Sequence, residues 1–192
     1  PSGRAGRPTK AARAQLLALA LAVLSIRAGE RVGLAGPLAP PRPGRAQLLT
    51  LTTALCAEPG PGDYGAPEVA GVAAQARAVF LSDFFGDLGA IEAALGALAD
   101  RGVTGVMLQV LDPAEEDFPF DGRTIFESMT GALRHETREA GDLRARYRAR
   151  LAERRDRLAR LAAQAGWQFS THHTGTPAQA ALLWLHRALE GA

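Results

Sequence analysis

Short apolar runs alternate with amphipathic stretches along most of the chain. Residues 78–84 form one such run, which ends abruptly in Ser82 and Asp83 and is followed by Gly86. A run of this length, bounded by glycine and polar residues, is typical of a buried strand in a parallel sheet. Residues 103–111 and 167–171 have the same character, so both are also predicted to be strands.

Segments with a 3.6-residue apolar period separate these runs and are predicted to be helices. They cover residues 10–28, 45–57, 87–100, 141–165 and a C-terminal segment that opens at residues 176–177. Thr9 and Asp87 are suitable N-caps for the first and third of them. The first helix is apolar on most sides, with Leu16 in its main stripe, which predicts burial all round. Weaker patterns predict a short strand at residues 31–35, a short helix at 68–76 and an edge strand at 123–128, with a turn near Gly131.

Strands that alternate with helices indicate an α/β fold, here a doubly wound, mostly parallel sheet with helices on both faces. The chain shows neither an internal repeat nor an interdomain linker, so residues 1–192 are predicted to form a single domain. Right-handed crossovers require a strand before the first helix. Because residues 1–8 read as a Gly/Pro/Arg loop, we expect that strand upstream of Pro1.

Composition narrows the class of protein. The formal net charge of +2 is too small to indicate a nucleic-acid partner, and Lys10 is the sole lysine. The single Cys56 rules out an internal disulfide, which favours a reducing cytoplasm; its apolar surroundings predict a buried, inert thiol. The longest apolar run, residues 16–24, is about half the length of a membrane span, so no membrane insertion is predicted.

The predicted strand ends bring polar side chains to one edge of the sheet. Because Mg²⁺ prefers oxygen ligands, Asp83 is the candidate metal ligand, with Ser82 in support. The alternative is that Asp83 caps the following loop or helix and Asp112 makes a turn before a proline. His172 and His173 point to opposite faces of a strand, so they are predicted to be solvated loop histidines and not a metal pair.

Other features predict little chemistry. Neither a phosphate-binding loop nor a nucleophile elbow is present, and no catalytic residue is assigned. The arginine-rich residues 144–160 include Glu153 and Asp156, which predicts a solvated, salt-bridged helix face. The acidic and aromatic residues 114–122 are predicted to keep their carboxylates wet and to bury Phe118 and Phe120; a partner-binding loop is the alternative.

Residues 108–120 read Leu-Gln-Val-Leu-Asp-Pro-Ala-Glu-Glu-Asp-Phe-Pro-Phe and are followed by Gly122-Arg123 and Phe126-Glu127. With residues 29–34, 81–84 and 166–172, they resemble the bacterial family called domain of unknown function fifty-eight. That family is similar to von Willebrand factor A domains, which are doubly wound and often hold Mg²⁺ at a metal-ion-dependent adhesion site.

The resemblance implies that Asp83 matches the aspartate after the fourth strand of that fold, and that the D-x-S-x-S motif lies upstream of Pro1. The threonine of such sites has no clear counterpart, since Thr50 and Thr52 fall inside a predicted helix. The resemblance also implies a MoxR-type AAA+ ATPase as partner.

We therefore predict a protein-interaction module and not an enzyme. In it, a divalent cation held by Asp83, directly or through water, leaves a position open for a partner's carboxylate. A single carboxylate binds Mg²⁺ weakly, so no metal is predicted on this chain as given. Two alternatives stay open: a metal-free scaffold domain, and a metal-assisted hydrolase that uses Asp83 and Asp112.

Overall fold

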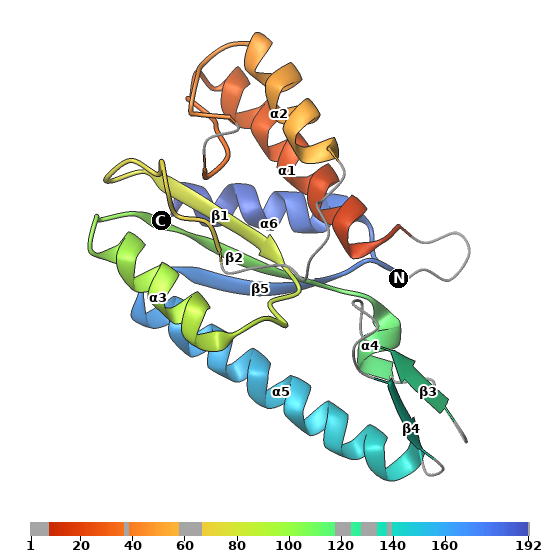
Figure 1. Cartoon of the computed structure of the whole chain (residues 1–192). Coiled ribbons are helices and arrows are strands. Elements are labelled where there is room, and N and C mark those ends of the chain that lie inside the picture. The colour runs from red at the N-terminus through yellow and green to blue at the C-terminus, as the bar shows by residue number, and fades with distance from the viewer. Residues whose placement is uncertain are drawn as a thin grey trace.

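Three parallel strands form the centre of the protein (Figure 1). The computed structural model describes residues 8–36, 39–57, 67–117, 124–127, 134–137 and 140–191. The sheet has the order β1-β2-β5, with β1 at Arg77–Ser82, β2 at Thr104–Leu111 and β5 at Gln168–His173. All three strands run in the same direction, so their carboxyl ends lie at one edge of the sheet.

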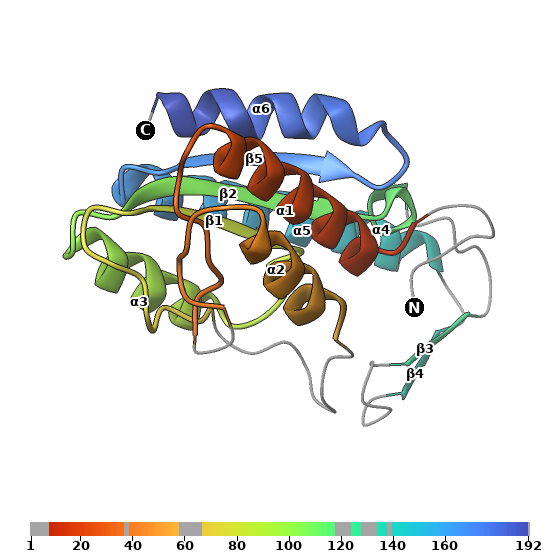
Figure 2. The ribbon, with the colours of Figure 1, turned by 90° about the horizontal axis from the view of Figure 1, so that it is seen from above.

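Helices cover both faces of this sheet (Figure 1). On one face lie α1 (Lys10–Arg27) and α6 (Ala178–Glu190), and on the other lie α3 (Leu88–Ala99) and α5 (Ala140–Gln164). Seen from above, α1 crosses over β1, and α2 (Ala46–Cys56) lies beside α1 on the side away from α6 (Figure 2). The α/β class with helices on both faces is confirmed, and it is consistent with a doubly wound fold.

The position of β2 at the centre of the sheet explains why its sequence is apolar almost without interruption. Seven of its eight residues are buried, because helices lie over both faces and strands lie on both sides. Met107 packs into the core beneath α3 and α5, whereas Val106 and Leu108 pack into the core beneath α1 and α6. The polar exception is Gln109, which is completely buried.

The helix starts follow the predicted capping residues. The Thr9 hydroxyl accepts a hydrogen bond from the backbone N–H of Ala12. The Asp87 carboxylate accepts from Gly89 and Ala90. Both side chains satisfy donors of the first helical turn that have no partner within the helix.

Two weak predictions in the first half of the chain are wrong. Residues 31–35 form no strand, since Val32 makes an isolated bridge to Arg42, and the returning segment contains prolines that cannot extend a ladder. Residues 68–76 form turns and no helix, because Gly71 and Gln75 adopt positive φ values of 75° and 58°. Leu16 is 54% exposed, since α1 buries Leu17 and Leu21 on another side.

The segment after β2 also differs from the prediction. It contains α4 (Pro113–Asp117) and a hairpin of β3 (Thr124–Glu127) and β4 (Arg134–Thr137). The hairpin forms a separate antiparallel sheet, so β3 is not an edge strand of the central sheet. Phe118, Phe120 and the turn near Gly131 lie outside the described residues.

Candidate functional site

The carboxyl ends of the three strands bring polar residues of all three together, among them the predicted Ser82 and Asp83. Ser82 of β1 is in register with Gln109 of β2, which is in register with Thr171 of β5. Asp83 directly follows β1. The buried amide of Gln109 donates to the Asp83 carbonyl at 2.9 Å, and its oxygen accepts from the Thr171 hydroxyl at 3.4 Å. Gln109 therefore ties the three strand ends together.

A lysine ammonium group lies between two carboxylates at this edge. Lys10 Nζ, at the start of α1, is 2.7 Å from Asp83 Oδ2 and 2.5 Å from Glu115 Oε1. About a fifth to a quarter of each of these three side chains is exposed, at 21%, 25% and 20%. The ammonium group also lies 4.9 Å from the centre of the Phe85 ring. We call Lys10, Asp83 and Glu115 the lysine–carboxylate cluster.

The charges of the cluster contribute to the pKa shifts of Lys10 and of Tyr147. Burial lowers the pKa of Lys10, but the hydrogen bonds and negative charges of Asp83 and Glu115 outweigh this effect and raise the pKa above 10.5. Burial, with the charge of Glu115 second, raises the pKa of the nearby Tyr147 above 10.0. Lys10 is therefore charged, and Tyr147 neutral, at physiological pH.

The turn that carries Asp83 is held by its own hydrogen bonds. Asp83 Oδ1 accepts from the Phe85 N–H at 3.1 Å, and Ser82 Oγ accepts from the Phe84 N–H at 3.0 Å. Phe84 is buried and has a φ of 53°, a left-handed conformation that is uncommon for a residue other than glycine. From α5, Arg154 donates to the carbonyls of Phe84 and Gly86.

The second carboxylate is positioned by a capping box at the start of α4. Asp112 Oδ1 accepts from the Ala114 N–H at 2.8 Å, while Glu115 Oε2 accepts from the Asp112 N–H at 3.0 Å. This reciprocal pattern is the usual device for a helix start. Asp112 thus makes the turn that was the structural alternative for it, and the other oxygen of Glu115 is left for Lys10.

His172 is buried, which corrects the prediction of a solvated loop histidine. The strand β5 runs two residues further than predicted, so only 6% of His172 is exposed. Arg13 Nη1 lies 2.8 Å from His172 Nε2, so Nε2 acts as acceptor and Nδ1 carries the proton toward the Thr176 hydroxyl at 3.3 Å. Burial, and then the charge of Arg13, lower the pKa of His172 to about 4.

Two further predictions concern residues away from this edge, which are Cys56 and the arginines of α5. Cys56 is exposed and not buried, because it follows the buried Leu51 by five residues and so lies on another side of α2. Most arginines of α5 are exposed as predicted, and Arg157 pairs with Glu92; Arg144, Arg154 and Arg155 are half-buried.

These contacts decide whether a divalent cation can bind at Asp83 and Ser82. Both oxygens of Asp83 and the hydroxyl of Ser82 already have partners within the protein. In the part of the chain that the structure describes, no three His, Cys, Asp or Glu side chains gather as a metal site. A Mg²⁺ ion at Asp83 would have to displace the Lys10 ammonium group, so the residues present do not fit a resident cation.

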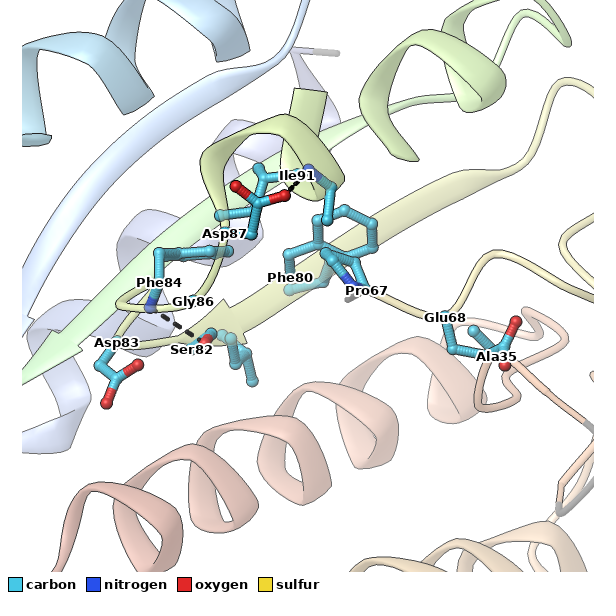
Figure 3. Close-up of a pocket in the computed structure, with 13 residues that line it drawn as sticks. Ala35, Pro67, Glu68, Phe80, Ser82, Asp83, Phe84, Gly86, Asp87 and Ile91 are labelled. Carbon is cyan, nitrogen blue, oxygen red and sulfur yellow. Dashed lines mark hydrogen bonds between the residues drawn. The ribbon is translucent and has the colours of Figure 1, made fainter. Parts of the chain in front are cut away.

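A groove lies beside the cluster, along the outer edge of β1 (Figure 3). Its volume is about 570 Å³, and its lining includes Val79, Phe80 and Leu81 of β1. Asp83 stands at one end and Glu68 at the other (Figure 3). Ile91 of α3 contributes to one wall. No pattern in the sequence predicts this groove, because the groove depends on how the strands are ordered in the sheet.

Comparison with models of known families identifies the family of this chain. Residues 2–157 match the model of the family described as "Protein of unknown function DUF58". The chain belongs to the DUF58 family. No curated protein and no solved structure matches this DUF58 chain. Across its described residues, none of its helices combines the length and apolar character that crossing a membrane requires.

Proposed function

We propose that this DUF58 chain is a protein-interaction module whose contact surface lies at the carboxyl edge of its sheet and needs no resident metal. The observation that carries the proposal is the position of the Lys10 ammonium group between Asp83 and Glu115. These residues come from α1, the turn after β1, and α4. The ion pairs thus join three distant segments into one surface.

Phe85 gives this surface an anchor for a partner. Phe85 is one of the large apolar side chains that stay exposed, with 39% of its surface accessible, and its ring lies against the charged Lys10. An aromatic ring beside a polar cluster is typical of the residues that dominate the binding energy of protein interfaces. A MoxR-type AAA+ ATPase is the partner that the family resemblance supports.

We also propose that the domain is not catalytic. In a metal-assisted hydrolase, Asp83 and Asp112 would share an ion and activate water. Here Asp112 caps α4 and Asp83 is paired with Lys10. Each carboxylate is engaged in holding its own segment in place.

A cation-dependent contact of the von Willebrand factor A type is the second candidate. The convergence of Asp83 and Glu115 on one position favours it, because two carboxylates can hold Mg²⁺ together with water. It requires that Lys10 leave that position. The two candidates therefore differ in one measurable property, which is whether binding needs a metal.

The test measures binding of a purified MoxR-type ATPase to the native protein and to Phe85→Ala, with and without EDTA. We expect Phe85→Ala to weaken binding by about tenfold or more, as for an interface anchor worth over 1.4 kcal/mol. EDTA should have no effect. Leu183→Ala is the matched control, because Leu183 is an exposed apolar residue of α6, at 52%. Binding that EDTA abolishes would contradict the proposal and favour the second candidate.

A further inference from the structure

The turn that joins β1 to α3 places one phenylalanine inside the protein and the next one outside. Phe84 is buried in the core beneath α3 and α5, whereas 39% of Phe85 is exposed. The backbone of Phe84 adopts a φ of 53°. For a bulky residue this conformation is unfavourable, and it persists only where surrounding contacts impose it. The contacts that hold this turn therefore decide where Phe85 points.

Two of these contacts come from the turn itself. Ser82 Oγ accepts a hydrogen bond from the Phe84 N–H (Figure 3), and Asp83 Oδ1 accepts one from the Phe85 N–H. Both bonds engage N–H groups of the turn. The carbonyl groups on either side of Phe85 are held by another element.

Arg154 of α5 supplies the donors for both carbonyls. Its Nε donates to the Phe84 carbonyl at 2.5 Å, and its Nη2 donates to the Gly86 carbonyl. These two nitrogens lie on one edge of the planar guanidinium group, so their N–H bonds have a fixed relative geometry. One rigid group thus holds the backbone before and after Phe85. A lysine has a single ammonium nitrogen on a flexible stem and cannot fix two carbonyls in this way.

The position of Arg154 is itself fixed by the core. Arg154 is half-buried on the side of α5 that carries the buried Leu151 and Leu158, three residues before it and four after. Burial lowers the pKa of Arg154, because the charged group loses water, and the two carbonyl bonds replace part of that water. The helix α5 lies on the face of the sheet opposite α1 (Figure 1), so Arg154 and Lys10 hold the turn from opposite sides.

We propose that Arg154 is a positioning residue for the contact surface, which keeps residues 83–86 in one conformation so that Phe85 is ordered before a partner binds. A partner then does not have to order the turn, which raises its affinity. For its effect on binding, this inference rests on the proposed function. The order of Phe85 in the free protein is a property of this chain alone and is measured without a partner.

Nitrogen-15 relaxation of the free 192-residue protein tests this ordering. We expect order parameters of about 0.85 at the amides of Phe85 and Gly86 in the wild type, as for a rigid backbone, and below about 0.6 in Arg154→Lys. Arg157→Lys is the matched control, because Arg157 lies on the same helix and half of its side chain is exposed. Unchanged order at Phe85 in Arg154→Lys would overturn the proposal. Loss of order throughout β1 and α5 would also overturn it, since Arg154 would then support the whole domain.

Binding of the purified MoxR-type ATPase tests the consequence. Arg154→Lys should weaken binding about tenfold in the wild-type background and have little effect in the Phe85→Ala background, because Arg154 acts through Phe85. Wild-type affinity in Arg154→Lys, or an equal loss in both backgrounds, would overturn the proposal. If the wild type does not bind the ATPase, the proposed function fails, while the relaxation experiment still decides whether Arg154 orders the turn.

Discussion

Replacing Lys10 by methionine tests the energetic role of the lysine–carboxylate cluster. Methionine keeps most of the apolar side chain and removes the ammonium group, which leaves Asp83 and Glu115 as two negative charges without their shared partner. Hydrogen bonds to charged groups contribute about 1.5–3 kcal/mol each, and ordering a lysine costs about 2 kcal/mol. Two such bonds, less the cost of ordering the side chain, give about 1–4 kcal/mol; because the substitution also leaves the two carboxylates unpaired, we expect a net loss near the middle of that range, about 2–3 kcal/mol.

The assay is urea unfolding followed by circular dichroism, with thermal unfolding beside it. For a domain of this size, a loss of 2–3 kcal/mol corresponds to a Tm lower by roughly 4–12 °C. The double variant Lys10→Met/Asp83→Asn, with both single variants, gives the coupling between the two groups. We expect a coupling free energy of about 1–2 kcal/mol, as for charged groups in direct contact.

The matched control is Arg157→Met. Arg157 pairs with Glu92 at 3.4 Å, but half of each side chain is exposed, at 50% and 55%, so its loss should change stability by less than about 1 kcal/mol. The reasoning would be refuted if Lys10→Met were as mild as Arg157→Met. It would also be refuted if Lys10 and Asp83 proved additive.

Three further predictions concern other parts of the fold. Because the pKa of His172 is lowered from 6.5 to about 4, the unfolded chain takes up a proton in this window that the folded protein does not. Stability should therefore fall by up to about 3 kcal/mol between pH 6.5 and 4, and His172→Gln should flatten that slope in urea unfolding. Gly105→Ala should lower the free energy of unfolding by about 1–3 kcal/mol, since a Cβ there would meet the Ala78 carbonyl at 2.2 Å. Gly96→Ala, where the Cβ would enter open space, should raise it by about 0.5–1 kcal/mol. Equal effects of the two variants in thermal unfolding would contradict this. Cys56 should react at once with a thiol reagent in the native state, and a need for denaturant would contradict its exposure.

The sequence allowed the strands and helices of the sheet to be predicted because their signals are local. The apolar run before Asp83 and the 3.6-residue period after Asp87 each depend on residues within a dozen positions. The same locality explains the errors. Positive φ values at Gly71 and Gln75 leave little trace in hydrophobic periodicity, and β5 was ended too early because His172 is polar.

Only part of the candidate site could be predicted from the sequence. Asp83 stands at the predicted sheet edge, but Lys10 and Glu115, its cationic and acidic neighbours, lie 73 and 32 positions away in the sequence, with Lys10 and Glu115 themselves 105 apart. No local pattern connects residues at such separations. The Asp112-x-x-Glu115 spacing did carry a signal, since it is a capping box that fixes the direction of the Glu115 carboxylate.

The most direct test of the central claim is a nitrogen-15 NMR titration of Lys10. Because Lys10 is the sole lysine, labelling lysine gives one side-chain ammonium resonance. We predict that this group loses its proton only above pH 10.5, as its raised pKa requires, and that millimolar Mg²⁺ leaves its resonance unchanged at neutral pH. A pKa at or below 10.5, or a resonance that Mg²⁺ shifts in the wild type but not in Asp83→Asn, would contradict the account.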